Sequence, residues 1–136
     1  MGKASRDKGA RFELFVEHAL KPVFPDARKM GGAQTRDQKY SDVEGTPFRI
    51  QAKHWASLTY GDLVRALKKE AADGLAHDDT RIPIAITKID FQKDPLVSMT
   101  LRSFLALVEK HFWREPHLAD VIPIRDFVEE PSNEQE

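Results

Sequence analysis

Four side chains in the first 53 residues have types and spacing suited to hydrolytic chemistry at a phosphate: Glu13, Asp42, Gln51 and Lys53. Gln51 and Lys53 are two positions apart in a predicted strand, so their side chains project from the same face. Asp42 is expected on a neighbouring strand, across a short turn, and Glu13 on a helix beside its apolar stripe. If that helix packs over the open end of the two strands, all four side chains meet.

Oxygen atoms of this set are suited to a hard cation such as Mg²⁺, which prefers oxygen ligands and keeps several waters. Glu13, Asp42, the Gln51 carbonyl and the backbone carbonyl of Ala52 could supply them, directly or through water. A metal bound there would lower the pKa of a water and neutralise charge on a phosphodiester. Lys53 would position or activate that water and stabilise the transition state.

An amphipathic helix is predicted to carry Glu13, because apolar residues around it recur at the i, i+3, i+4 and i+7 spacing of a half-buried helix. Ser5 or Asp7 is expected to cap its start, and Pro22 helps to end it. Residues 25–39 are mostly polar and are expected to form a loop or a ragged strand.

A hairpin is predicted to carry the other three side chains. Its strands are Tyr40–Glu44 and Phe48–Trp55, joined by a turn that begins at Gly45. Gln51 and Lys53 face one side of the second strand, and Phe48, Ile50 and Ala52 face the other. The hairpin therefore predicts which residues share the side of the candidate site.

The remaining elements give the predicted order α-β-β-α-β-β-α, with a short final strand possible at Val121–Val128. They are a helix capped by Thr59 and Asp62, strands at Ile82–Ile89 and Leu96–Leu101, and a helix at Ser103–Phe112. The apolar run at Ile82–Ile89 is typical of a central strand. Strands and helices mixed in this way predict the α/β class, a mixed sheet flanked by helices.

Composition bounds the alternatives. With 136 residues the chain is long enough for one core, so we expect a single domain over residues 1–125. Residues 126–136 contain five acids and no base, and we expect a disordered acidic tail. Cysteine is absent, which excludes thiolate metal sites and cysteine nucleophiles. No apolar run suggests a membrane span or signal peptide, so we expect a cytoplasmic protein.

Three segments carry a resemblance to a known family: Lys8–Glu13, Ser41–Val43 and Ile50–Lys53. With the strand and helix order that follows, the chain resembles the PD-(D/E)XK nuclease superfamily over roughly residues 6–112. Within that superfamily it is similar to the small archaeal-type and phage Holliday junction resolvases. The resemblance implies a restriction-endonuclease-like mixed β-sheet, Mg²⁺ or Mn²⁺ as cofactor, and a homodimer that cuts branched or duplex DNA in a prokaryotic or phage-infected cell.

By the same resemblance, Glu13, Asp42 and Gln51 take the metal-ligand positions and Lys53 that of the catalytic lysine. Two residues depart from the family pattern. Ser41 stands where the family has proline, and Gln51 stands where it has Glu or Asp. Some superfamily members resemble this chain in having Gln there and are active. A neutral amide offers a weaker ligand than a carboxylate, so the substitution implies weaker metal binding or a lost activity.

The first 40 residues are basic, with nine Lys and Arg against five Asp and Glu, which permits contact with phosphates. The candidate DNA-contacting residues flank the proposed site in sequence: Lys8, Arg11, Lys29, Arg36 and Lys39. Glu44 is a second candidate for the ligand position of Asp42, because it shares the same face of the predicted strand. His54 is expected to be packed, and Trp55 and Tyr60 either stack on bases or pack in the protein.

The function predicted from these residues is a metal-dependent, structure-selective DNA endonuclease that resolves four-way junctions. Two related alternatives are another nuclease of the same superfamily (nicking, flap or restriction type) and a non-catalytic DNA-binding module on a nuclease fold. A small interaction protein, acting through its acidic tail and without a nucleic acid partner, is the third. Neither a membrane partner nor a small-molecule cofactor is expected.

Overall fold

The computed structural model describes residues 2–31 and 40–111. Over these residues the chain is a mixed α/β protein with three helices and two small sheets, one of them mixed. It divides into two compact units, Met1–Thr100 and Leu101–Glu136, and each is described by itself. The domain boundary predicted at residue 125 lies outside the described residues, as does the acidic tail at 126–136.

Helix α1 (Lys3–Leu20) presents Phe12 and Val16 to the interior, in agreement with the predicted apolar stripe. The expected start was wrong. Ser5 and Asp7 lie inside the helix, which begins after Gly2, and Gly2 makes no side-chain cap. The helix extends toward the N-terminus because lysine, alanine and arginine in its first turns are good helix formers that need no apolar contact.

The larger sheet has the order β3-β4-β5. Strands β3 (Phe48–Trp55) and β4 (Ile82–Ile89) pair in parallel along their whole length, from Phe48 opposite Ile82 to Trp55 opposite Ile89. Strand β5 (Leu96–Ser98) pairs antiparallel with the other edge of β4. The apolar run was therefore correctly predicted as the central strand, whereas the following strand ends three residues before the expected Leu101.

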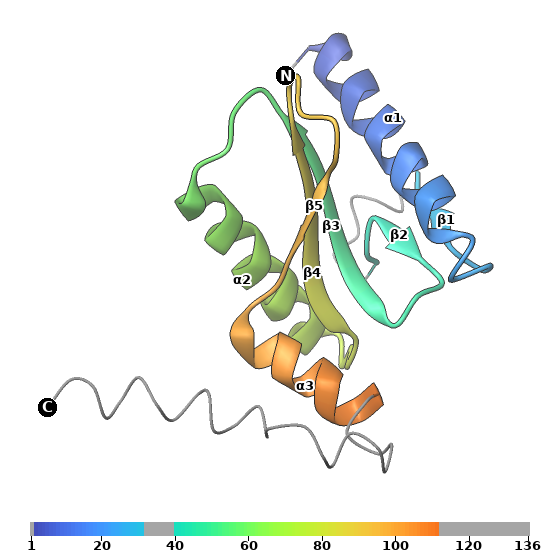
Figure 1. The fold of residues 1–136 in the computed structure, drawn as a ribbon, viewed down its shortest axis with the longest axis vertical. Helices are drawn as coiled ribbons and strands as arrows, with labels where there is room; N and C mark the ends of the chain where they lie inside the picture. Colours follow the sequence, from blue (N-terminus) through green and yellow to red (C-terminus); the bar gives the residue numbers. More distant parts are fainter. Residues whose placement is uncertain (1, 32–39, 112–136) are drawn as a thin grey trace, which may run out of the picture. The chain divides into compact units, whose positions relative to one another are not determined.

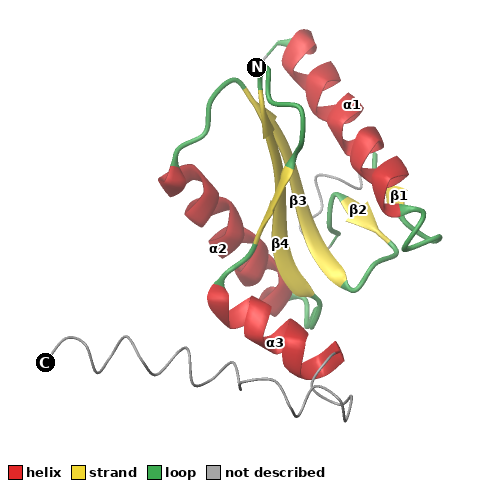
Figure 2. Cartoon of the chain, viewed as in Figure 1, coloured by secondary structure: helices red, strands yellow, loops and turns green. Residues whose placement is uncertain are grey.

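Helix α2 (Tyr60–Ala76) makes the crossover between the two parallel strands. It begins with the predicted capping box: Thr59 Oγ1 accepts from the Asp62 N–H, and the Asp62 carboxylate accepts from the Thr59 N–H. The two helices cover opposite faces of the sheet, with α1 and α2 on either side of β3 and β4 (Figure 1, Figure 2). Both faces of β3 are therefore covered by a helix, so its polar side chains reach solvent only at its edge and its ends.

The predicted hairpin was wrong. Strand β2 (Val43–Glu44) pairs antiparallel with β1 (Arg28–Lys29), while β3 takes β4 as its parallel neighbour. The Asp42 N–H still donates to the Ile50 carbonyl over 2.9 Å, so β2 runs past the outer edge of β3 without forming a ladder with it. The inner edge of β3 is therefore paired with β4, and its outer edge meets Asp42, just before β2, through single hydrogen bonds.

Gly45 explains why β2 turns toward β1. Its φ of 88° lies in the left-handed region, which favours glycine. A Cβ at this position would lie 2.1 Å from the backbone oxygen of Asp26, so only glycine fits against the chain just before β1. This close approach holds Asp42, three residues earlier, beside β3.

The second unit contains helix α3 (Leu101–His111), which begins two residues before the predicted Ser103. Lys110 and His111 lie in its last turn, where a positive charge interacts favourably with the helix dipole. The predicted last residue of this helix, Phe112, and the predicted strand Val121–Val128 lie outside the described residues. No helix among residues 2–31 and 40–111 is long and apolar enough to cross a membrane.

Candidate active site

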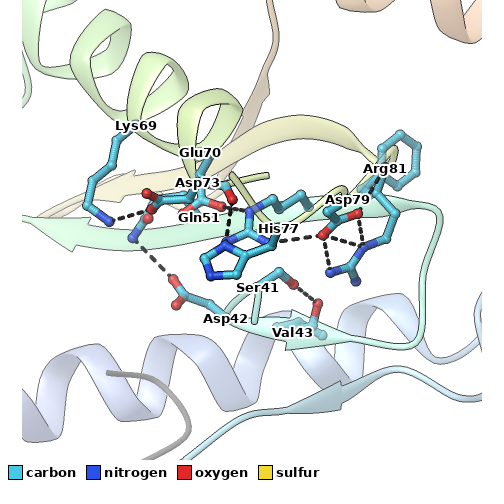
Figure 3. Close-up of polar contacts among 12 residues, drawn as sticks. Ser41, Asp42, Val43, Gln51, Lys69, Glu70, Asp73, His77, Asp79 and Arg81 are labelled. Carbon is cyan, nitrogen blue, oxygen red and sulfur yellow. Dashed lines mark hydrogen bonds and ion pairs between the residues drawn. The ribbon is translucent and has the colours of Figure 1, made fainter. Parts of the chain in front are cut away.

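Asp42 lies at the outer edge of β3, and its carboxylate bonds to that edge. Its Oδ2 atom accepts from Gln51 Nε2 over 3.2 Å (Figure 3), and also from the Ala52 backbone N–H over 2.9 Å. Because N–H and C=O of one strand residue point to the same edge, the Ala52 carbonyl faces this side as well. The structure therefore brings together three of the predicted oxygen donors, those of Asp42, Gln51 and Ala52.

Glu13 approaches the same place from α1. Partial burial is the main cause that raises its pKa, to about 7, and the charge of Asp42 raises it further. The charges of Lys29 and Lys53 act in the opposite direction and lower it. A solvated helix acid would feel none of these groups strongly, so Glu13 belongs to the cluster rather than to the open surface.

The pKa of Asp42 is also raised, chiefly by burial. The hydrogen bond from Ala52 and the charge of Lys53 partly offset that effect, followed by the charges of Lys69 and Arg49. Lys53 therefore lies within electrostatic reach of both carboxyls, as its predicted role requires. Lys69, on α2, was not predicted to lie near the site. In the sequence it is one lysine of a helix with an acid, Asp73, four residues later, and the two form an ion pair of 2.9 Å.

The donor set fits a hard cation. Glu13 and Asp42 are partly buried, and the charge of Asp42 raises the pKa of Glu13. A divalent ion bound between them would stabilise their charged forms. In the described part of the chain no three His, Cys, Asp or Glu side chains form a group that could hold a metal. A metal here would therefore need further ligands: water, the Ala52 carbonyl or the Gln51 side-chain oxygen. Rotation of the Gln51 amide by a half-turn would place that oxygen where Nε2 now faces Asp42.

Glu44, the second candidate for the ligand position of Asp42, is used elsewhere. Its Oε1 pairs with Arg81 Nη1 at 2.9 Å, and its Oε2 accepts from the Ser41 N–H over 2.7 Å. Proline at position 41 would lack that N–H donor. The serine that departs from the family pattern therefore has a local role, and the structure favours Asp42 over Glu44 as the carboxylate of the site.

A buried ionic network lies next to the site and was not predicted. Arg49 is 1% exposed; its Nε lies 2.9 Å from Glu70 Oε2 and its Nη1 lies 3.0 Å from Asp79 Oδ2. Arg81 pairs with Asp79 (Figure 3) and also with Glu44, so the network links β2, β3, α2 and the residues just before β4. The sequence carried no distinct signal for it, because Arg49 shares its strand with other polar residues such as Gln51 and Lys53. Once buried, its guanidinium group needs carboxylate partners.

The predicted DNA-contacting residues separate into three groups. Lys29 lies near the carboxyls, as its effect on the pKa of Glu13 shows. Lys8 and Arg11 line a pocket beside the N-terminal half of α1, together with the predicted packed residue His54. Arg36 and Lys39 lie outside the described residues. The basic surface therefore has two described parts, one at the candidate site and one at this pocket.

The two aromatic residues near the end of β3 differ in exposure. Tyr60 is 82% exposed at the start of α2, while Trp55 is half-buried at the end of β3. Neither lines the pocket. Comparisons of the chain with protein-family models, curated proteins and solved structures give no match.

Proposed function

We propose that this protein is a metal-dependent, structure-selective DNA endonuclease that resolves four-way junctions. The observation that supports it is that Asp42 is hydrogen-bonded to the outer edge of β3, beside Gln51, and that Lys53 lowers the pKa of both Asp42 and Glu13 through its charge. A mixed sheet with a helix on each face is compatible with the restriction-endonuclease-like fold that the sequence resembles. That assignment of the fold is part of the proposal.

In this proposal the carboxylates of Glu13 and Asp42 hold Mg²⁺ or Mn²⁺, with the Ala52 carbonyl and the Gln51 oxygen as further donors. The metal, when bound, supplies Lewis acidity and a water of lowered pKa. Asp42 is fixed for this role by the Ala52 N–H, so its orientation does not depend on a ligand. The raised pKa of Glu13 reflects a site in which added positive charge is favourable.

Lys53 acts on the phosphate. Its charge influences both carboxyls. It shares a face of β3 with Arg49, which pairs with Glu70 of α2, so it stands on the face that α2 covers. There it would orient the attacking water and offset the negative charge that develops on the phosphoryl oxygens. A homodimer is part of the proposal, because two sites related by a two-fold axis can cut a junction symmetrically.

One observation favours the second candidate, a DNA-binding module without catalysis. The Gln51 amide donates to Asp42 Oδ2 and so occupies an oxygen that a metal would otherwise use. The deciding experiment compares a four-way junction with a linear duplex of equal sequence, each with Mg²⁺ and with EDTA. Symmetric cutting of the junction alone, and only with Mg²⁺, supports the proposal.

Each other result has a distinct meaning. Equal Mg²⁺-dependent cutting of both substrates would retain the nuclease and remove junction selectivity. Salt-dependent binding without cutting would establish the binding module. Absence of DNA binding at low salt would leave only the interaction protein.

A further inference from the structure

A pocket of about 250 Å³ lies between the N-terminal half of α1, the end of β3 and the residues that follow β4, and none of the site carboxyls lines it. Four cationic side chains line it: Lys8, Arg11, Lys88 and Lys93. Lys88 lies on β4 directly opposite His54 of β3, so the base of the pocket is formed by paired strands. A rigid base of this kind positions charged groups with little ordering cost.

Only one of the four cations in the pocket is paired with an acid in the described part of the chain. Asp90 pairs with Lys8 Nζ at 2.7 Å and lies 3.0 Å from His54 Nε2. Among the described residues, Lys8 is the only one of the four cations with a carboxylate partner within ion-pair distance. The pocket is therefore a position of positive potential, suited to an anion.

One wall of the pocket is aromatic. Phe15 is 53% exposed and stacks on Phe12, with ring centroids 6.2 Å apart and planes inclined by 13°. Phe12 is 4% exposed and its ring also contacts that of His54, at 5.8 Å. Phe15 is thus held from behind by a buried ring, while part of its own surface stays open. A fixed, exposed aromatic ring beside cations is the arrangement on which nucleic acid bases stack.

We propose that this pocket binds an unpaired nucleotide of a DNA strand, with the base stacked on Phe15 and the phosphate between Arg11, Lys88 and Lys93. The choice of DNA rests on the proposed function; the nucleotide chemistry rests on the pocket itself. Neither a hydrophobic ligand nor a cation would use the three lysines and the arginine. A simple anion would use them but would not use the open face of Phe15.

The pocket lies near the candidate active site along β3. His54 is two residues beyond Ala52 on the same face, about 7 Å along the strand. A strand bound by its phosphate at the carboxyls would therefore reach the pocket within one or two nucleotides. Branch points and strand ends offer unpaired bases, and this pocket would select for them.

A second copy of the chain is the other occupant to consider for the exposed Phe15. A two-fold interface centred on this pocket would bring its cations against the same cations of the partner, which is unfavourable. A polyanion meets no such repulsion. The charge of the pocket therefore favours a nucleic acid over a copy of the same protein.

The experiment measures binding of the full chain to a short fluorescent oligothymidylate and to a blunt duplex, by anisotropy in EDTA, where no cutting occurs. Phe15→Ala should weaken oligothymidylate binding about tenfold and leave duplex binding almost unchanged, while Phe15→Trp should bind like the wild type. Lys93→Ala should weaken binding and reduce the single-strand salt slope by about 0.7. The matched controls are Leu75→Ala, an exposed apolar residue of α2, and Lys68→Ala, an exposed lysine of the same helix.

If Phe15→Ala behaves like Leu75→Ala, the proposal is overturned. It is also overturned if Phe15→Ala changes the oligomeric mass by light scattering but not DNA binding, because Phe15 would then serve a protein interface. The proposed function is judged separately, by cutting with Mg²⁺. A chain that never cuts, yet loses oligothymidylate binding through Phe15→Ala, would refute the nuclease and keep the nucleotide site.

Discussion

Gln51 Nε2 donates to Asp42 Oδ2 over 3.2 Å, so a carboxylate in its place would face another carboxylate at a similar distance. Without a metal, that pair would be repulsive and one of the two acids would hold a proton. With a metal, both would be ligands. The amide therefore contributes to folding stability at the same position where a carboxylate would contribute to metal affinity.

Gln51→Glu should reverse this balance. In EDTA near pH 8 we expect it to unfold about 1–3 kcal/mol more easily than the wild type, because a buried hydrogen bond becomes a repulsion. Mg²⁺ at one hundred times its Kd should raise the free energy of unfolding of this variant by about 2–3 kcal/mol, because a ligand at that concentration stabilises the folded state by that amount. Urea unfolding in EDTA and in Mg²⁺ measures both effects.

The matched control is Gln51→Met, which has a similar shape, no charge and no oxygen ligand. It should lose stability in EDTA but gain nothing further from Mg²⁺ relative to the wild type. An equal response of the two variants to Mg²⁺ would show that position 51 does not contact the metal.

Lys53→Ala should lower the rate of DNA cutting by about 100- to 1,000-fold, the usual effect of removing one group that stabilises developing charge. Junction binding in EDTA should stay close to that of the wild type, because Lys53 acts on the transition state more than on the ground state. Gel assays of cutting and binding measure the two separately. Lys68→Ala, on the exposed face of α2, should cut normally; a Lys53→Ala protein that also cuts normally would exclude the assigned site.

At the scale of the elements, the turn at Gly45 decides where Asp42 lies. Gly45→Ala should destabilise the fold by at least about 2 kcal/mol, because alanine is strained at a φ of 88° and its Cβ would overlap the Asp26 oxygen. Gly9→Ala in α1 is the matched control: nothing lies within 4 Å of its Cβ, so it should stabilise by about 0.5–1 kcal/mol. Thermal melts of both variants test the contrast, and an undisturbed Gly45→Ala protein would contradict it.

Elements with a continuous local signal were predicted well. The apolar run of β4 and the capping box of α2 are encoded in adjacent residues, and both agree with the structure. The hairpin failed because strand pairing depends on which distant edge is nearest, and β4 enters the chain only 34 residues after β3. The side chains at the site nevertheless come together, since Asp42 reaches β3 through single hydrogen bonds rather than a ladder.

At the scale of the whole molecule, the buried network has three carboxyls for two guanidinium groups. Glu70 has a pKa raised to about 7, first by burial, which Arg49 only partly offsets. A proton on Glu70 balances the network, so the folded state binds it more tightly than the unfolded chain. Arg81 holds the pKa of Asp79 below its ordinary value, so Asp79 loses its contribution to stability only when the solution becomes more acidic than that ordinary value.

This network predicts a pH profile. The contribution of Glu70 to stability is complete below about pH 4.5 and is lost as the pH rises through 7, on the order of 1–3 kcal/mol. Glu70→Gln should flatten that decline, whereas Glu109→Gln, an exposed acid of α3, should keep it. Urea unfolding at pH 5 and pH 8 gives the comparison, and an unchanged slope in Glu70→Gln would contradict the prediction.

No local pattern could reveal the network or the pocket, because each joins residues from at least three elements. Arg49, Glu70 and Arg81 are ordinary charged residues in sequence, and Phe15 differs from Phe12 only in how much of its ring is covered. Charge alone pointed to Lys8 and Arg11 as DNA contacts, but not to the aromatic wall beside them. Tertiary proximity supplies that information.

The parallel ladder between β3 and β4 also determines the order of events in refolding. Every pair in it joins residues 34 positions apart, so the strands can meet only after a long loop has closed. Helix α2 shortens that loop if it forms first. Thr59→Ala, which removes the capping box, should therefore slow refolding by about fivefold while hardly changing the unfolding rate. Stopped-flow chevrons would show it, and a faster unfolding limb instead would mean that the strands meet before the helix is formed.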